Sequence, residues 1–246
     1  MAANYYCILF DLDGTLLDFV SAEQVSIAST LEAFELPADE EVCAQFSAIN
    51  ASLWEQLEKG QIKKDKLSVM RFSMLLEKLG MAGDAIRMNN DYMTRLSAAA
   101  MPFAGAKELL EELSEFATLA VTSNGNQSVQ ESRLEKSGLA PYFDEIFVSE
   151  KLGVTKPQAR FFDTALRRLG IKSKEKVLVV GDSLTADIQG GINAGLDTCW
   201  CNFTNAENTL GIAPTYTVQG YEQLKLVAVG EEELKRAESR EKRHLV

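Results

Sequence analysis

The feature that most constrains the fold is a regular alternation of short apolar strands with helical segments after residue 101. Strand patterns occur at 118–122, 145–148, 177–180 and 198–201. Helical patterns occur at 104–115, 127–137, 158–169 and 184–194. Strands that alternate with helices form parallel sheets, because each crossover helix packs back onto the sheet. The sequence therefore predicts an α/β fold built on a doubly wound parallel sheet.

A long helical stretch separates the first predicted strand from this alternation. Residues 5–10 form an apolar strand that ends in the turn 11–14, whereas the chain from about 21 to 100 has one proline and apolar residues at helical spacing. We expect a discontinuous core of residues 1–17 and 96–246 and an inserted all-helical cap domain of residues 18–95. The tail beyond 231 places Glu231, Glu232 and Glu238 four residues before Lys235, Arg236 and Lys242, which favours a solvated helix.

The charge balance and the histidine count exclude several classes of function. The net charge of −11 disfavours binding to a nucleic-acid polymer or to an anionic membrane surface. The only histidine, His244, lies in the charged tail, so Ser-His-Asp catalysis and a His-ligated zinc site lack an imidazole. Any catalysis must use carboxylates, hydroxyls and amines.

Cysteine usage and the N-terminal segment predict a cytoplasmic protein. The four cysteines, Cys7, Cys43, Cys199 and Cys201, are scattered through apolar segments, which favours reduced buried thiols over disulfides or a metal site. The first residues do not read as a signal peptide, and no apolar run approaches membrane-spanning length. The oligomeric state is left open by the sequence.

Four of the predicted strand ends carry residues that can bind or transfer phosphate. These residues are Asp11 and Asp13 after the first strand, Ser123, Asn124 and Gly125 after the second, Lys156 beyond the third, and Asp182, Ser183 and Asp187 after the fourth. Ligands of open parallel sheets bind at the carboxyl ends of the strands. One acidic strand end is often a turn former or a helix cap, but that interpretation explains four such ends poorly.

The same segments resemble the motifs of the haloacid dehalogenase superfamily. They read CILFDLDGTL, LAVTSNG, TKPQ and VLVVGDSLTAD, in that order, between residues 7 and 187. The helical insertion directly after DGT is similar to the helical-cap branch of the superfamily. The strings SAINASLW, RF and IAPTY resemble the pyrimidine 5′-nucleotidases of the YjjG/YfnB type, and that similarity extends to about residue 226.

The resemblance implies a phosphatase that works through an aspartyl-phosphate. Asp11 would attack phosphorus, and Asp13 would protonate the leaving oxygen and then deprotonate the attacking water. Lys156 would hold the nucleophile and the phosphoryl oxygens together, and Ser123, Asn124 and Gly125 would bind the remaining phosphate oxygens. Aligning the second motif on Asn-Gly assigns its hydroxyl to Ser123, with Thr122 as the alternative.

A divalent cation is expected at the same place. Two carboxylates that face a phosphate dianion repel it unless a cation lies between them, and an oxygen-only site suits Mg²⁺. The expected ligands are Asp11, the carbonyl group of Asp13, and Asp182. Asp187, together with Ser183, is expected to orient Lys156 or a metal-bound water instead of binding the metal.

The predicted function is hydrolysis of a small phosphorylated metabolite, with a nucleoside monophosphate as the favoured substrate. Specificity would come from the cap, where Asn50, Trp54 and Arg71 are candidate substrate contacts. Helix capping, core packing and surface ion pairing explain these three residues equally well. A phosphoglycolate-type or sugar-phosphate phosphatase or phosphomutase is the alternative enzyme, and a non-enzymatic interaction protein is a more distant one.

Overall fold

The chain contains one parallel sheet whose order places two acidic strand ends side by side. The computed structural model describes the backbone of residues 3–244 and the side chains of residues 3–237. The sheet has the order β3-β2-β1-β4-β5-β6, and every neighbouring pair is parallel. Its strands are β1 (Cys7–Phe10), β2 (Thr118–Ser123), β3 (Glu145–Val148), β4 (Val177–Gly181), β5 (Asp197–Cys201) and β6 (Tyr216–Val218). The predicted doubly wound parallel sheet is confirmed.

The chain order reverses next to β1, which creates the position where such sheets bind ligands. The chain adds β2 and β3 on one side of β1 and then returns to place β4 on the other side. Phe10, the last residue of β1, pairs with Val121 of β2 and with Val180 of β4. The carboxyl ends of β1 and β4 therefore adjoin at the switch point, the place where open parallel sheets generally bind ligands.

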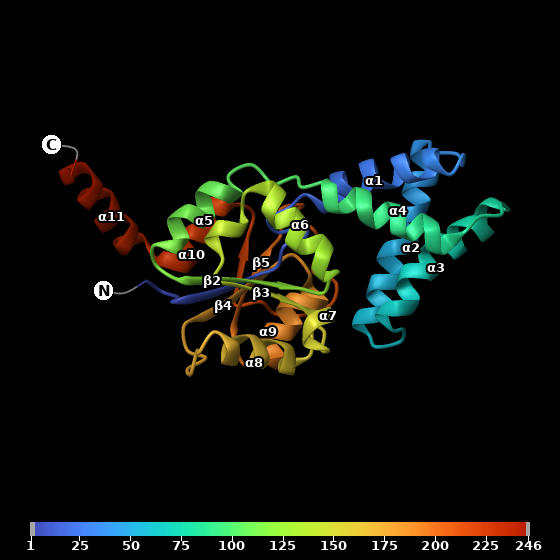
Figure 1. Cartoon of the computed structure of the whole chain (residues 1–246). Helices are drawn as coiled ribbons and strands as arrows, with labels where there is room; N and C mark the ends of the chain where they lie inside the picture. Colours follow the sequence, from blue (N-terminus) through green and yellow to red (C-terminus); the bar gives the residue numbers. More distant parts are fainter. Residues whose placement is uncertain (1–2, 245–246) are drawn as a thin grey trace. The chain divides into compact units, whose positions relative to one another are not determined.

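Helices cover both faces of the sheet (Figure 1). One face carries α5 (Ala106–Ser114) and α10 (Tyr221–Val229), and the other carries α8 (Ala159–Arg168) and α9 (Gln189–Asn193). β1 and β4 are buried along their whole length, as expected of central parallel strands covered on both sides. Leu9 and Val179 pack with Phe161 and Phe162 of α8 in one apolar cluster.

Two local elements differ from the sequence-based expectations. The predicted helix 184–194 is split into a π-helical turn (Leu184–Ile188) and α9, because the N–H of Ile188 donates five residues back to the carbonyl oxygen of Ser183. β6 was not predicted, since three residues at a sheet edge carry little periodicity. Short helical segments also occur at Ala140–Tyr142 and at α7 (Ser149–Leu152).

The helices between β1 and β2, apart from α5, form a second unit with most of α6, and this unit is helical throughout as predicted. This unit comprises residues 18–101 together with 128–137, so it extends beyond the expected 18–95. Its helices are α1 (Phe19–Ala33), α2 (Glu40–Glu58), α3 (Lys64–Leu79), α4 (Ala85–Ala98) and most of α6 (Gln127–Ser137). The segment 128–137 joins the unit because Ser132 and Arg133 donate hydrogen bonds to the carbonyl oxygens of Ser97 and Ala99.

Aspartates in the sequence determine where three of these helices begin. Asp18, Asp39 and Asp84 precede α1, α2 and α4, and each carboxylate accepts hydrogen bonds from backbone N–H groups of the first turn. Such caps satisfy donors that have no partner inside the helix. Gly80 ends α3 at a φ of 66°, a conformation that glycine adopts without a steric penalty.

One buried polar network connects all four helices α1–α4. Asn50 of α2 donates to Glu23 of α1 at 2.6 Å and accepts from Arg71 of α3 at 3.3 Å. Arg71 also donates to Asn89 of α4 at 2.6 Å, and its guanidinium lies 4.6 Å from the ring centroid of Tyr92. Burial raises the pKa of Glu23, and it lowers the pKa of Arg71. The network therefore satisfies groups that would be costly to bury alone.

The C-terminal helix α11 (Glu231–His244) is present as predicted. Lys235 pairs with Glu231 at 2.6 Å, as expected, whereas Arg236 pairs with Glu233 and not with Glu232. The predicted pair Glu238–Lys242 and the side chain of His244 lie outside the described residues. Across the described part of the chain, no helix is both long and apolar enough to cross a membrane.

We expect Arg71→Met to lower the free energy of unfolding by about 1–3 kcal/mol, because it leaves buried polar partners without hydrogen bonds. Lys78→Met on the exposed side of the same helix is the matched control and should change stability by less than about 0.5 kcal/mol. Chemical denaturation of both variants measures the difference. Equal stability of the two variants would contradict a structural role for the network.

Candidate active site at the carboxyl edge of the sheet

Asp11 continues the direction of β1 by one residue and points into the switch-point edge. Its N–H donates to the carbonyl oxygen of Val180 at 2.7 Å, which extends the pairing of β1 with β4. Leu12 is fully buried, whereas Asp13 lies close enough to Asp11 for its charge to raise the pKa of that carboxyl. The spacing D-x-D thus presents two carboxylates at one strand end.

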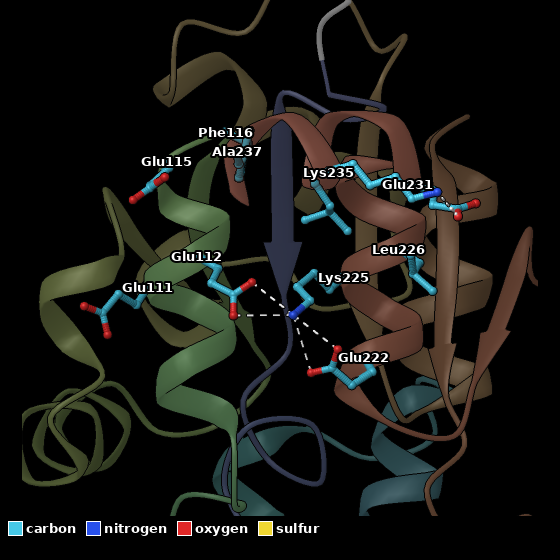
Figure 2. A pocket seen from close by; sticks show the side chains of 11 residues that line it. Glu111, Glu112, Glu115, Phe116, Glu222, Lys225, Leu226, Glu231, Lys235 and Ala237 are labelled. Atoms are coloured by element: carbon cyan, nitrogen blue, oxygen red, sulfur yellow. Dashed lines mark hydrogen bonds and ion pairs between the residues drawn. The ribbon is translucent and has the colours of Figure 1, made fainter. Parts of the chain in front are cut away.

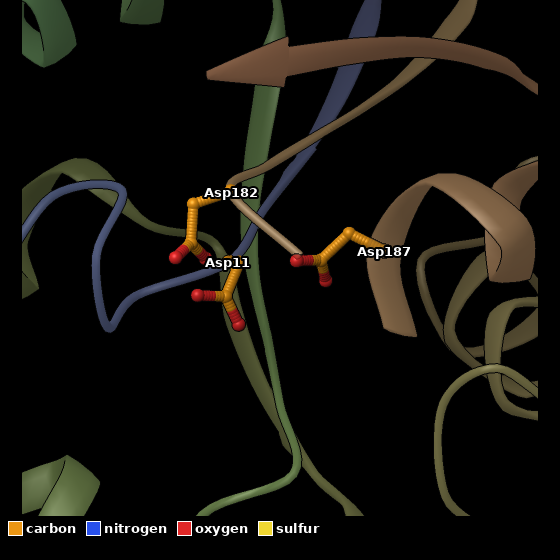
Figure 3. A group of neighbouring side chains, drawn as sticks. All are labelled: Asp11, Asp182 and Asp187. Carbon is orange, nitrogen blue, oxygen red and sulfur yellow. The ribbon is translucent and has the colours of Figure 1, made fainter. Parts of the chain in front are cut away.

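Asp182 and Asp187 join Asp11 in a cluster of three carboxylates (Figure 3). One oxygen from each of the three lies within 4.8 Å of the others. Two glycines make this approach possible. A Cβ atom on Gly14 would lie 2.3 Å from an oxygen of Asp182, and one on Gly181 would lie 2.2 Å from an oxygen of Asp187. No larger residue fits at either position without moving a carboxylate.

Lys156 neutralises part of this cluster. Its Nζ lies 2.6 Å from Oδ1 of Asp11 and 2.6 Å from Oδ1 of Asp187, and it donates to the carbonyl oxygen of Thr122 at 2.8 Å. The side chain is only 2% exposed. Although burial disfavours the charged form, the ion pairs with Asp11 and Asp187 raise the pKa of Lys156 above its ordinary value. Lys156 therefore remains a cation within the protein.

Both carboxylate oxygens of Asp187 accept hydrogen bonds from the protein. Its Oδ1 accepts from Lys156 at 2.6 Å, and its Oδ2 accepts from the N–H of Ser183 at 3.2 Å. This second contact lies within the π-helical turn, where Asp187 accepts a hydrogen bond from Ser183, the residue that precedes the turn. These contacts fit a residue that orients Lys156 better than one that binds a metal directly.

The carboxylates outnumber the available cation, and this excess changes their pKa values. Burial and the neighbouring Asp187, Asp182 and Asp13 raise the pKa of Asp11, against the lowering effect of Lys156. Desolvation by the surrounding protein, together with the charges of Asp187 and Asp13, raises the pKa of Asp182 to about 7, although Asp182 is exposed to solvent. An oxygen-only donor set with surplus negative charge fits a divalent cation such as Mg²⁺. Asp11 and Asp182 have the geometry to hold it.

Asn124 acts on the backbone of Lys156. Its Nδ2 donates to the carbonyl oxygen of Lys156 at 3.0 Å, and its Oδ1 accepts from the N–H of Lys156 at 2.9 Å. Asn193 donates in addition to the carbonyl oxygen of the next residue, Pro157, at 3.0 Å. The position of the lysine therefore depends on two asparagines from other elements, a role for which the sequence gives no local signal.

The two hydroxyls of the second motif have different surroundings. Thr122 is fully buried and donates to the carbonyl oxygen of Phe10 at 3.2 Å, so its hydroxyl bonds within the sheet. The hydroxyl oxygen of Ser123 accepts from the N–H of Gly125 at 2.9 Å, in the loop that follows β2. This geometry favours Ser123 over Thr122 as the phosphate contact.

The predicted cap residues do not form one group. Asn50 and Arg71 lie in the buried network of the helical unit, hydrogen-bonded to each other. Trp54 is half-buried and packs against a separate cluster of Leu53, Leu57 and Leu67. Trp54 is thus the cap candidate with the most accessible side chain.

A groove of about 560 Å³ lies elsewhere in the sheet unit, between α5, α10 and α11 (Figure 2). Lys225 spans it, 3.1 Å from Glu112 and 3.2 Å from Glu222. None of the predicted site residues lines this groove. Phosphate chemistry is therefore assigned to the carboxylate cluster.

Comparisons with known proteins agree with the geometry. The sequence model of the haloacid dehalogenase-like hydrolases matches residues 8–201. The chain is 40% identical over 221 residues to the pyrimidine 5′-nucleotidase PynA of Streptococcus pneumoniae, covering 89% of this chain and 93% of PynA. It is 35% identical over 225 residues to the pyrimidine 5′-nucleotidase YjjG of Escherichia coli, covering 89% of this chain and 95% of YjjG.

A solved structure extends the agreement to three dimensions. The magnesium-bound crystal structure of YfnB from Bacillus subtilis is 38% identical and superposes with a TM-score of 0.86, covering 90% of this chain and 97% of that one. Because the family match includes all four motif segments and the relatives cover about nine-tenths of the sequence, this chain belongs to the haloacid dehalogenase-like hydrolase family.

Proposed function

We propose that this protein is a Mg²⁺-dependent phosphomonoesterase that hydrolyses nucleoside monophosphates, with a preference for pyrimidines. The observation that carries the proposal is the buried ion pair of Lys156 with Asp11, next to Asp182 at the switch point of the sheet. The names of PynA and YjjG support the substrate class. The four free, buried cysteines support a reducing, cytoplasmic setting.

The proposed reaction has two displacements at phosphorus. An oxygen of Asp11 attacks, the bond to the ester oxygen breaks, and Asp13 gives that oxygen its proton. Water then attacks the aspartyl-phosphate, its proton passes to Asp13, and the bond to Asp11 breaks. Inorganic phosphate leaves, and both carboxyl groups return to their starting states.

The rest of the site holds charge in place during these steps. Lys156 opposes the effect of burial on the pKa of Asp11 and contributes positive charge beside the transferring group. The hydroxyl of Ser123 and backbone N–H groups of the loop through Asn124 and Gly125 contact the other phosphate oxygens. Asp11, Asp182 and the carbonyl group of Asp13 would hold a Mg²⁺ ion, whose charge would offset the repulsion of several kcal/mol between carboxylates and a phosphate dianion.

Base recognition is proposed for the helical unit, because the carboxylate cluster provides only phosphate chemistry. Trp54 is the proposed stacking surface, with Asn50 and Arg71 as the polar candidates. The protein would then distinguish one small phosphorylated metabolite from another by contacts to groups of the substrate that are remote from phosphorus.

Replacing Asp11 and Asp13 should have different consequences for different leaving groups. Asp11→Asn removes the nucleophile and should lower kcat by several orders of magnitude for every ester. Asp13→Asn should lower kcat for a nucleotide by about 10²–10⁴-fold but lower it less for p-nitrophenyl phosphate, whose leaving group needs little protonation.

Steady-state kinetics on both substrates test this pattern, with folding checked by circular dichroism. Asp163→Asn, an exposed carboxylate of α8, is the matched control and should retain full activity. Turnover by Asp11→Asn at the wild-type rate would refute the nucleophile assignment.

The stabilisation by Mg²⁺ should increase with pH. The pKa of Asp182 is raised from its ordinary value of 3.8 to about 7, so between these pH values the metal-free folded state binds more protons than the unfolded state. Its stability therefore falls as pH rises through that window. Mg²⁺ binds the deprotonated carboxylates, so its effect should grow from about pH 5.5 to about pH 8. Thermal melts with Mg²⁺ or with EDTA measure the shift in Tm.

EDTA should also abolish turnover, and added Mg²⁺ should restore it. Asp182→Asn should remove both the Tm shift and its pH dependence. Activity that survives thorough chelation would exclude the proposed metal dependence.

Trp54→Ala should weaken nucleotide recognition selectively. Loss of base stacking costs on the order of 1–3 kcal/mol, so kcat/KM for pyrimidine monophosphates should fall about 5- to 150-fold, while that for p-nitrophenyl phosphate should stay nearly constant. Trp54→Phe retains an aromatic face, so its kcat/KM for pyrimidine monophosphates should fall less than that of Trp54→Ala.

A panel of phosphorylated metabolites completes this test. We expect pyrimidine monophosphates to give the highest kcat/KM. Phosphoglycolate or sugar phosphates ranking as high would favour the alternative substrates. A parallel loss of Tm and of both activities in Trp54→Ala would assign Trp54 to packing.

A further inference from the structure

The indole of Trp200 is hydrogen-bonded to the residue that carries one of the candidate metal-binding carboxylates. Trp200 is the fourth residue of β5, and its Cα pairs in register with Gly181, the last residue of β4. Its Nε1–H donates to the backbone carbonyl oxygen of Asp182 at 2.8 Å. The side chain is only 7% exposed. The proposed mechanism leaves this residue without a role.

Asp182 needs such a contact because the sheet no longer holds it. The pairing of β4 with β5 ends at Gly181, so the peptide group that follows Asp182 lies beyond the strand ladder. Trp200 fixes the carbonyl end of that peptide, and the N–H end, which belongs to Ser183, donates to Asp187 at 3.2 Å. Both ends of one peptide unit are thereby held by side chains.

The backbone of Gly14 limits Asp182 from another direction. A Cβ atom there would lie 2.3 Å from Oδ2 of Asp182, so the carboxylate rests against the turn that follows Asp13. With its peptide held by Trp200 and its carboxylate held against Gly14, Asp182 projects toward Asp11 (Figure 3). Rigid support of this kind lowers the ordering cost of binding a cation.

We infer that Trp200 is a positioning residue of the metal site, whose indole N–H fixes Asp182 in the orientation that binds a divalent cation. The inference rests on the proposed metal dependence and assigns a residue that does not itself touch metal or phosphate. It also makes Trp200 a reporter of metal binding, because the indole donates to the same residue whose carboxylate would bind the ion.

The test variant is Trp200→Phe, which keeps an aromatic ring in the apolar site and removes the N–H donor. We expect the Kd for Mg²⁺, measured by isothermal titration calorimetry without substrate, to rise about 10- to 100-fold. Turnover at limiting Mg²⁺ should fall, and higher Mg²⁺ should restore it toward the wild-type value. Packing alone does not predict rescue by metal.

Tyr216→Phe is the matched control. It removes one hydroxyl that hydrogen-bonds to Tyr5, keeps its ring, and lies on β6, the neighbour of β5 in the sheet. Its Kd for Mg²⁺ should equal that of the unmodified protein. An unchanged Kd in Trp200→Phe, with the wild type binding Mg²⁺, would overturn the inference and leave the proposed function intact.

A measurement on the unmodified protein does not depend on how the variant folds. The sequence has two tryptophans, so the ¹H–¹⁵N correlation spectrum of a ¹⁵N-labelled sample contains two indole N–H peaks. The peak that is missing from the spectrum of Trp54→Phe belongs to Trp54, and the other belongs to Trp200. We expect the Trp200 peak to shift on addition of Mg²⁺ with the calorimetric midpoint, and the Trp54 peak to stay in place. A stationary Trp200 peak during saturating Mg²⁺ binding would overturn the inference. Absence of any Mg²⁺ binding would overturn the proposed function as well.

Discussion

The site depends on one buried cation. Lys156 lies 2.6 Å from both Asp11 and Asp187, in surroundings where an unpaired charge of either sign would be strongly disfavoured. Without Lys156, Asp11, Asp187 and Asp182 would face one another with no positive charge among them. The lysine lowers the pKa of Asp11 against the stronger effects of burial and neighbouring carboxylates. Because three carboxylates share this one cation, the site is suitable for a divalent cation.

Sheet topology and support from neighbouring segments give this ion pair its position. The order β3-β2-β1-β4 brings the residues after β1 and β4 together, although they are far apart in the sequence. Asn124 then holds the backbone of Lys156 through two hydrogen bonds, and Trp200 holds that of Asp182. The geometry of the charged groups is therefore determined largely by uncharged residues around them.

The strand ends could be predicted from the sequence with good accuracy. The segments 145–148 and 177–180 are strands in the structure, with one further residue on the latter, because β-branched and apolar runs bounded by turn residues are a local signal. The segment 184–194 was less predictable. Its composition favours a continuous helix, but the contact of Asp187 with Ser183 and Lys156 accompanies a π-helical turn that local propensity does not encode.

The sequence by itself determined the parallel sheet, the helical insertion and the acidic strand ends, because hydrophobic periodicity is visible in short segments of chain. The residues directly after each predicted strand are likewise local, and these are the positions that bind ligands in parallel sheets. Only the tertiary structure decided which polar residues support which others. Asn124 and Lys156 are 32 residues apart, and Trp200 and Asp182 are 18 apart. Arg71 likewise finds Asn50 and Asn89 on other helices. Such hydrogen bonds form between elements that only folding brings together, so neither hydrophobic periodicity nor residue spacing in the sequence predicts them.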